Sequence, residues 1–233
     1  MKLAPMSRRT FLAAALGAAG SLGLAACGSA HSDKSASTAA ATSAASASAS
    51  ATTDADAATS AETGVDYSRG THHATLEIAD YGTVKLELFA TNAPKTVANF
   101  AKLVNEGFYD GLTFHRIIKG FMMQGGDPNG DGTGGSGETV EGEFSSNGHP
   151  NPISHTRGTI SMARSSAPNS ASSQFFIMQE DSVNLNGNYA AFGHVTDGMD
   201  VVDAICNSAE PTDSNGTIAK DKQPKICSLR MDD

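Results

Sequence analysis

Residues 114–127 read FHRIIKGFMMQGGD and form the most informative stretch of the chain. The stretch predicts two short strands, at 113–118 and 121–124. It sets one cation, Arg116, beside Phe, Met and Gln side chains at alternating strand positions. A second dense segment, SMAR at 161–164 followed by SQFFI at 173–177, again pairs apolar and amide side chains. We therefore expect both segments to contribute to one site.

Outside these segments the chain predicts strands more often than helices. Residues 74–79 (ATLEIA) and 83–89 (TVKLELF) alternate on both sides of a turn at 80–82, as in an antiparallel hairpin. Further strands are expected at 159–163, 174–178, 191–195 and 225–231.

Two helices are expected among the strands. Asn92 is the predicted N-cap of the first, Pro94 lies in its first turn, apolar residues follow at helical spacing, and Gly107 is the stop signal. The second is expected at 198–207. Eight short strands with two helices predict an all-β fold, an eight-stranded closed antiparallel barrel capped by two α-helices. Strands and helices do not alternate regularly, which disfavours a doubly wound sheet.

From about Thr71 to Met231 the chain resembles the cyclophilin family of peptidyl-prolyl cis-trans isomerases, and the runs at 114–127 and 173–177 are the most specific part of the match. Cyclophilins are eight-stranded antiparallel barrels with a helix closing each end, in agreement with the strand pattern. The resemblance implies an enzyme that accelerates rotation of X-Pro peptide bonds in proline-containing segments, with no cofactor and no metal.

The resemblance also implies a role for each residue of the expected site. Arg116 would be the catalytic guanidinium, and Gln124 would contact the substrate and orient it. The pocket for the proline ring would be lined by Phe121, Met122, Phe176 and Leu185. A neighbouring groove, where backbone groups pair with the substrate main chain, would be lined by Gly132, Ala163, Arg164 and Gln174.

These residue types suit the reaction. Rotation about an amide bond meets a barrier of about 18 to 20 kcal/mol, and an X-Pro bond takes tens to hundreds of seconds to cross it. No covalent bond has to break. A guanidinium can donate a charge-assisted hydrogen bond to the prolyl nitrogen as its lone pair localises, while an apolar pocket holds the ring.

The sequence departs from the family pattern at two pocket positions. Many cyclophilins have Trp just before the pocket leucine and His a few residues later, where this chain has Asn184 and Tyr189. We expect Tyr189 to close the pocket and contribute a hydroxyl. Because cyclosporin uses the missing indole, we expect weak binding of that drug.

The N-terminus has the pattern of an export signal. Residues 1–26 place Lys2, Arg8 and Arg9 before an apolar run of 16 residues, shorter than the roughly 20 that a spanning helix needs. The segment SRRTFL at 7–12 resembles a twin-arginine motif, although Ala13 replaces the common Lys and leaves the general export route open. LAAC at 24–27 resembles a lipoprotein lipobox, which predicts a lipid on Cys27 and an anchor on the extracytoplasmic face of the bacterial membrane.

Residues 27–63 form a second compositional unit. They are dominated by Ala, Ser and Thr, so no core can form and we expect a disordered tether. The isomerase domain is then 64–233. The chain of 233 residues has a net charge of −9, which argues against nucleic-acid binding through bulk positive charge.

Three other patterns in the sequence could indicate a metal or nucleotide site. Residues 127–138 satisfy an EF-hand pattern, but the flanking sequence is strand-like and the loop is rich in Gly, so a calcium site is disfavoured. The glycines at 130, 132 and 135 match a dinucleotide fingerprint, but no amphipathic helix follows. The histidines lack metal-ligand spacing, and we expect structural or solvated roles.

Two questions stay open at this stage. Cys206 and Cys227 either form a disulfide in an oxidising compartment or are two small buried residues. A surface binding module or holdase that uses the same groove without turnover is the alternative to an isomerase. Nothing in the sequence requires an oligomer, so we expect a monomer.

Overall fold

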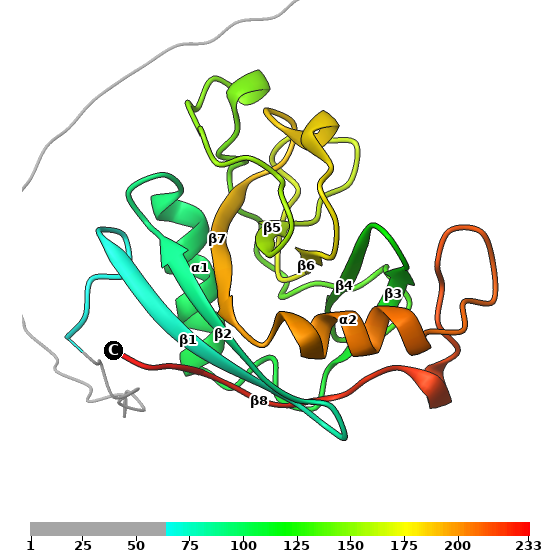
Figure 1. Cartoon of the computed structure of the whole chain (residues 1–233). Helices are drawn as coiled ribbons and strands as arrows, with labels where there is room; N and C mark the ends of the chain where they lie inside the picture. The colour runs from blue at the N-terminus through cyan, green and yellow to red at the C-terminus, as the bar shows by residue number, and fades with distance from the viewer. Residues whose placement is uncertain (1–63) are drawn as a thin grey trace, which may run out of the picture. The chain divides into compact units, whose positions relative to one another are not determined.

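The computed structural model describes residues 64–233, so the predicted signal peptide, Cys27 and tether lie outside the described residues. One eight-stranded antiparallel sheet dominates this part, with strand order β3-β4-β6-β5-β7-β2-β1-β8 (Figure 1). The strands are β1 Thr71–Ile78, β2 Gly82–Phe89, β3 Thr113–Ile118, β4 Met122–Asp127, β5 Thr159–Met162, β6 Phe175–Met178, β7 Ala191–Asp197 and β8 Ile226–Met231. The helices are α1 Pro94–Asn105 and α2 Met199–Ser208, with single 3-10 turns at Ser145–Asn147, Val183–Leu185 and Lys220–Lys222.

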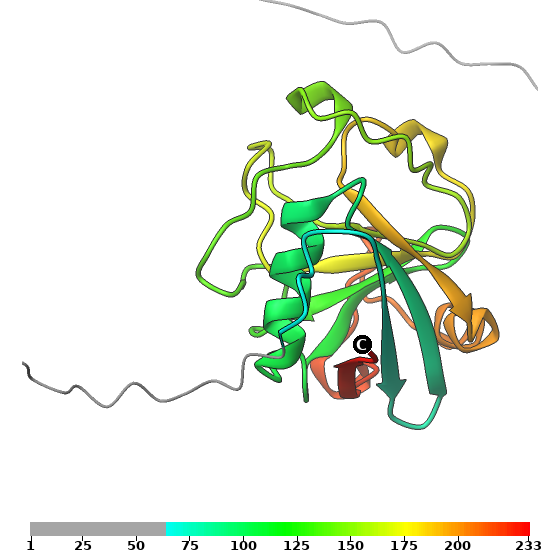
Figure 2. The same cartoon turned by 90° about the vertical axis from the view of Figure 1, so that its left-hand side faces the viewer.

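The sheet curls into a half-barrel rather than lying flat (Figures 1 and 2). Its first and last strands, β3 and β8, approach each other where Thr113 bridges Lys225 and the Phe114 N–H donates to the Pro224 carbonyl at 2.9 Å. All eight strands and both helices lie where the sequence predicts them. The all-β class is confirmed, and continuous closure into a barrel stays a prediction.

The two helices pack against different parts of the sheet. α1 contacts β2 and β8, whereas α2 contacts β2 and β4, and Figure 2 shows them on opposite sides of the curled sheet. Among residues 64–233, no helix has the length and apolar character needed to cross a bilayer.

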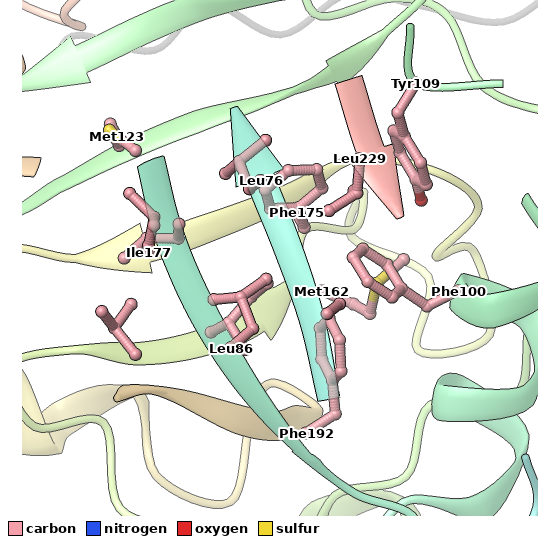
Figure 3. Packing of buried hydrophobic residues seen from close by; sticks show 14 of the residues in the cluster. Leu76, Leu86, Phe100, Tyr109, Met123, Met162, Phe175, Ile177, Phe192 and Leu229 are labelled. Atoms are coloured by element: carbon pink, nitrogen blue, oxygen red, sulfur yellow. The ribbon is translucent and has the colours of Figure 1, made fainter. Parts of the chain in front are cut away.

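Buried apolar side chains from β1, β2, β4, β5, β6, β7 and β8 pack together into one core, seen from close by in Figure 3. Alternate residues of β1 and β2 are buried, as a strand with one face in the core requires. Phe100 connects α1 to this core, with its ring centroid 5.1 Å from that of Phe192 and 5.7 Å from that of Phe175. Apolar burial therefore holds the curled sheet and α1 together.

The N-cap of α1 differs from the prediction. The helix begins one residue later than an Asn92 cap requires, at Pro94, and Ala93 occupies the cap position without a side-chain hydrogen bond. The buried carboxylate of Glu143 satisfies the free N–H groups instead, accepting from Lys95 N at 3.0 Å and Thr96 N at 2.8 Å. The cap comes from a distant part of the chain, so local sequence could not identify it.

The two cysteines of the domain are free thiols, so a disulfide between them is wrong. Cys206 is buried in α2, where burial raises the pKa of its thiol to about 12. Cys227 is exposed on β8. One side chain is part of the core and the other lies at the surface.

Candidate active site

Three neighbouring strands build the base of the site. In the register of the sheet, Arg116 of β3 pairs with Gln124 of β4, and Gln124 pairs with Phe176 of β6. Directly opposed residues of antiparallel strands project from the same face. The two sequence segments predicted to share a site therefore meet, although about 50 residues separate Gln124 from Gln174.

A small pocket of about 220 Å³ opens over these strands. Met122 and Phe176 are buried beneath it, and Leu185 and Tyr189 pack against them from the segment that precedes β7. The rings of Phe176 and Tyr189 meet edge to face with centroids 5.8 Å apart. The lining residues are Arg116, Phe121, Met122, Gln124, Ala163, Arg164, Phe176, Leu185 and Tyr189.

Arg116 is half-buried at the wall of this pocket, where its Nε and Nη1 nitrogens both donate to protein acceptors and Nη1 also lies 3.8 Å from Met122 Sδ. Its Nε donates to the Asn215 carbonyl at 2.8 Å, and its Nη1 donates to Gln124 Oε1 at 3.2 Å. Burial lowers the pKa of the guanidinium, while Tyr189 and Asp213 act in the opposite direction. A guanidinium does not lose its proton in proteins, so Arg116 acts as a charged donor.

A chain of amides fixes the orientation of Gln124. Its Oε1 faces Arg116, which can only donate, so its Nε2 must find an acceptor. Nε2 donates to Gln174 Oε1 at 2.9 Å, and Gln174 Nε2 donates to the Gly134 carbonyl at 2.8 Å. Because Gln174 is held by the backbone at 132–134 and in turn accepts from Gln124 Nε2, the oxygen of Gln124 is the atom that faces Arg116.

A second, more polar cavity of about 240 Å³ lies next to the pocket. Gln124, Ala163 and Arg164 line both cavities. The second cavity is completed by Gly132, Thr133, Gly134, Ser165, Ser170, Ser172 and Gln174. All four residues of the predicted groove, Gly132, Ala163, Arg164 and Gln174, line this cavity.

Arg164 is a wall of the site rather than a free cation. Its guanidinium lies over the rings of Phe144 and Tyr189, 5.1 and 4.9 Å from their centroids. Its Nε donates to the Asn188 carbonyl at 2.9 Å. Stacking and hydrogen bonding together hold the loop that carries Tyr189.

Every predicted substrate-contacting residue lies in one of these two cavities, so the structure assembles the whole predicted set. Asn184 is exposed on the Val183–Leu185 turn beside the pocket leucine, and weak cyclosporin binding stays a prediction. Sequence reasoning did not identify the Asn215 carbonyl as a partner of Arg116, because a backbone acceptor leaves no mark in side-chain patterns.

The EF-hand pattern at 127–138 has a structural explanation. The Asp127 carboxylate accepts the N–H groups of Asn129 at 2.8 Å and Asp131 at 3.1 Å, which stabilises a turn. Glu138 forms an ion pair with Lys102 at 3.0 Å. Within the described residues no group of three or more His, Cys, Asp or Glu side chains is arranged to hold a metal ion.

Comparisons with known proteins identify the family of the chain. Residues 73–229 match the family model described as cyclophilin type peptidyl-prolyl cis-trans isomerase/CLD. The chain is 47% identical over 130 residues to peptidyl-prolyl cis-trans isomerase B of Bacillus subtilis, covering 56% of this chain and 87% of that protein. It is 44% identical over 137 residues to a peptidyl-prolyl cis-trans isomerase of Helicobacter pylori, covering 58% and 80%.

A solved structure of a cyclophilin type isomerase has a similar fold. The crystal structure of a Cryptosporidium parvum cyclophilin type isomerase, determined in the presence of the dipeptide Ala-Pro, superposes with a TM-score of 0.61 at 33% identity. The match covers 69% of this chain and 99% of that one.

Proposed function

The chain belongs to the cyclophilin type peptidyl-prolyl cis-trans isomerase family, and from this membership and the geometry of its pocket we propose that Arg116 promotes rotation of X-Pro bonds in exported proteins. The isomerase activity is that of the family and of the named relatives. Our proposal concerns the residues that perform it and the place where it acts.

The arrangement of the guanidinium carries the proposal. Nε and Nη1 of Arg116 each have a protein acceptor, whereas no residue within 64–233 accepts a hydrogen bond from Nη2. Nη2 belongs to a side chain that lines the pocket, and it is the donor left for the substrate. In the proposed reaction it donates to the prolyl nitrogen as that atom pyramidalises, which favours the twisted amide over the planar one.

The apolar pocket supplies the rest of the rate enhancement. A 10⁵-fold acceleration requires a barrier lower by about 6.8 kcal/mol, at 1.36 kcal/mol per decade. One hydrogen bond to a charged group supplies roughly 1.5 to 3 kcal/mol. The proline ring would lie against Phe121, Met122 and Phe176, which exclude water and strengthen the bond from Arg116.

The N-terminal sequence supports an extracytoplasmic role. An export signal at 1–26, a lipobox ending at Cys27 and an Ala/Ser/Thr-rich tether up to residue 63 precede the domain. We propose a lipid-anchored monomer that works on proline-containing segments of proteins folding outside the cytoplasm. A random-coil tether of this length spans roughly 33 Å, which suits clients near the membrane surface.

Substitution of Arg116 tests the catalytic assignment. Arg116→Ala removes the donor and is expected to lower kcat/KM for a proline peptide at least about 100-fold, the usual cost of one preorganised donor. Circular dichroism should show an intact fold. Arg230→Ala, which removes an exposed arginine paired with Asp110 at 2.6 Å, is the matched control and keeps full activity.

The same variants separate isomerase from holdase. An isomerase accelerates refolding of a client limited by proline isomerisation, and Arg116→Ala loses this effect. A holdase suppresses client aggregation equally with or without the guanidinium. Full isomerase activity in Arg116→Ala would overturn the assignment of Arg116.

A further inference from the structure

We propose that Asp213, in the loop 211–217, is a positioning residue that holds the loop against β3 and thereby orients the guanidinium of Arg116. The inference rests on the proposed role of Arg116. It adds a residue that neither touches the pocket nor belongs to the predicted site.

The loop contacts β3 at the position of Arg116. Thr217 bridges Arg116 in antiparallel fashion, and the Ile117 N–H donates to the Gly216 carbonyl at 2.8 Å. The carbonyl of Asn215 then accepts from Arg116 Nε at 2.8 Å. Figure 1 shows this orange loop following α2 and returning beside β3. The loop therefore pairs with β3 through backbone hydrogen bonds, and the neighbouring Asn215 carbonyl accepts from the side chain of Arg116.

Glycine permits this close approach. Gly216 has φ +88, and a Cβ at this position would lie 2.4 Å from Ile118 Cγ1 and 2.7 Å from the Ile117 carbonyl oxygen. A larger residue would push the loop away from the strand. The distance between the loop and Arg116 is therefore set by backbone contact, and small displacements would break the Nε bond.

One carboxylate makes three of the hydrogen bonds that shape the loop, and backbone bonds from Thr212 N to the Thr217 carbonyl at 2.8 Å and from Gly216 N to the Asp213 carbonyl at 3.2 Å close it as well. Asp213 Oδ1 accepts from Asn215 N at 2.9 Å and Thr217 N at 3.0 Å, and its Oδ2 accepts from Thr217 Oγ1 at 2.8 Å. Residues 211–215 are otherwise exposed, so little apolar burial holds them. These hydrogen bonds flank the Asn215 carbonyl on both sides and determine where it points.

Two fixed points define the direction of a planar guanidinium. Gln124 Oε1 accepts from Nη1 at 3.2 Å and Met122 Sδ lies 3.8 Å from the same nitrogen, but contacts at one nitrogen leave the group free to rotate about it. The Nε bond holds a second nitrogen, and it aims Nη2. A long side chain retains substantial rotational freedom unless it is held in this way, and catalysis requires the donor to be preorganised. Asp213 supplies this order indirectly, through the Asn215 carbonyl.

The charge of Asp213 also favours the protonated guanidinium of Arg116. Burial lowers the pKa of Arg116, and Tyr189 and then the Asp213 carboxylate oppose this effect. The loop hydrogen bonds, led by those to Thr217, lower the pKa of Asp213 itself. The carboxylate is therefore ionised at neutral pH and a full acceptor.

The test compares three variants of the full chain. Asp213→Ala removes the acceptors and is expected to lower kcat about tenfold, the effect of one lost ordering hydrogen bond, with KM changed less than about twofold. Asp213→Asn keeps Oδ1 as an acceptor for both N–H groups and should retain kcat within about twofold. Asp221→Ala, another exposed aspartate outside loop 211–217 and outside both cavities, is the matched control and keeps wild-type kcat.

A second readout reports on Arg116 directly. Exchange of its Nε–H proton with solvent, followed by NMR and assigned with Arg116→Lys, should be slow in the wild type and in Asp213→Asn, and fast in Asp213→Ala. Thr217→Val removes only the hydroxyl donor to Asp213, and its Nε–H exchange rate should lie between those of the wild type and Asp213→Ala. This variant keeps the test possible if Asp213→Ala does not fold.

The outcomes separate this inference from the proposed function. Wild-type kcat and slow Nε–H exchange in Asp213→Ala overturn the positioning role, and so does an equal loss in Asp213→Ala and Asp213→Asn, which would indicate charge alone. If Arg116→Ala is inactive in either case, the proposed function stands. If Arg116→Ala is active, the proposed function fails first.

Discussion

At the scale of single residues, His155 lies behind the pocket and is fully buried. Its ring stacks on Phe176 with centroids 6.0 Å apart. Nδ1 faces Asn186 Oδ1 at 3.1 Å, and Nε2 faces the Ser161 hydroxyl at 3.0 Å. The neutral ring satisfies both contacts, because Nδ1–H donates to the amide oxygen and Nε2 accepts from the hydroxyl.

This environment predicts a pH-dependent stability. Burial lowers the pKa of His155, and the contact with Asn186 opposes this only in part. The stabilisation by neutral His155 is fully present above its unfolded pKa of about 6.5. It declines as the pH falls below this value and is lost once the pH passes below the folded pKa, because the unfolded chain binds the proton more readily.

We therefore expect the free energy of unfolding to fall between pH 7 and pH 5, and His155→Gln to weaken this dependence. Urea denaturation at a series of pH values measures both. Burial also lowers the pKa of His115, so some dependence persists in the variant. His73→Gln, at an exposed position of β1, is the control and keeps the wild-type curve. Identical slopes for wild type and His155→Gln would contradict the prediction.

At the scale of elements, α1 depends on a cap from outside its own sequence. Glu143 is 3% exposed, and its carboxylate accepts two backbone N–H groups of the first turn and the Thr96 hydroxyl at 2.7 Å. These contacts also connect α1 to the long segment between β4 and β5. A negative charge at this end complements the helix dipole.

We expect Glu143→Ala to lower the free energy of unfolding by about 2 kcal/mol, because buried N–H groups lose their acceptor. Glu143→Gln keeps one acceptor oxygen and should lose less. Chemical denaturation provides the measurement. Glu138→Ala, which breaks only the exposed ion pair with Lys102, is the control with an expected change below about 1 kcal/mol. Equal losses in Glu143→Ala and Glu138→Ala would refute the capping role.

At the scale of the whole molecule, the proposal joins an anchored N-terminus to the isomerase domain. A thioether-linked lipid on Cys27 would bury its methylenes at about 0.8 kcal/mol each. We expect the wild type to take up labelled fatty acid and to fractionate with membranes. Cys27→Ser should lose the label and appear in the soluble extracytoplasmic fraction with unchanged isomerase activity.

A second cysteine provides the control for this experiment. Cys227 is exposed on β8, so Cys227→Ser tests whether any accessible thiol accounts for the label. It should remain labelled and membrane-bound. A wild type without label, or Cys27→Ser that still sediments with membranes, would rule out the anchor.

Much of the fold was predictable because short-range patterns report it. Strand 113–118 matches β3 residue for residue, and α2 differs from its predicted range by one residue at each end. β4 extends three residues beyond the predicted end at Gln124, through Gly125 and Gly126 to Asp127. A Cβ on Gly125 would lie 2.8 Å from the Thr113 carbonyl oxygen, so glycine is there for close strand approach.

The site residues were predictable for a different reason. Arg116, Gln124 and Phe176 stand in two distinctive runs, and the sheet register places them side by side as the resemblance implies. The choice of elements follows from the sequence because periodicity and turn signals act over a few residues. The pocket side chains followed instead from the family resemblance, which rests mainly on the runs at 114–127 and 173–177.

The contacts that hold these elements and side chains in place were decided by the tertiary structure alone. The Glu143 cap of α1, the contact of His155 with Asn186 and the Asn215 carbonyl on Arg116 join residues far apart in the chain. The free state of both thiols likewise depends on where Cys206 and Cys227 lie after folding. Such contacts depend on where the backbone passes after folding, and a carbonyl oxygen is the same in every residue. Sequence therefore indicates which side chains gather at the site, whereas only the folded chain shows what holds them in place.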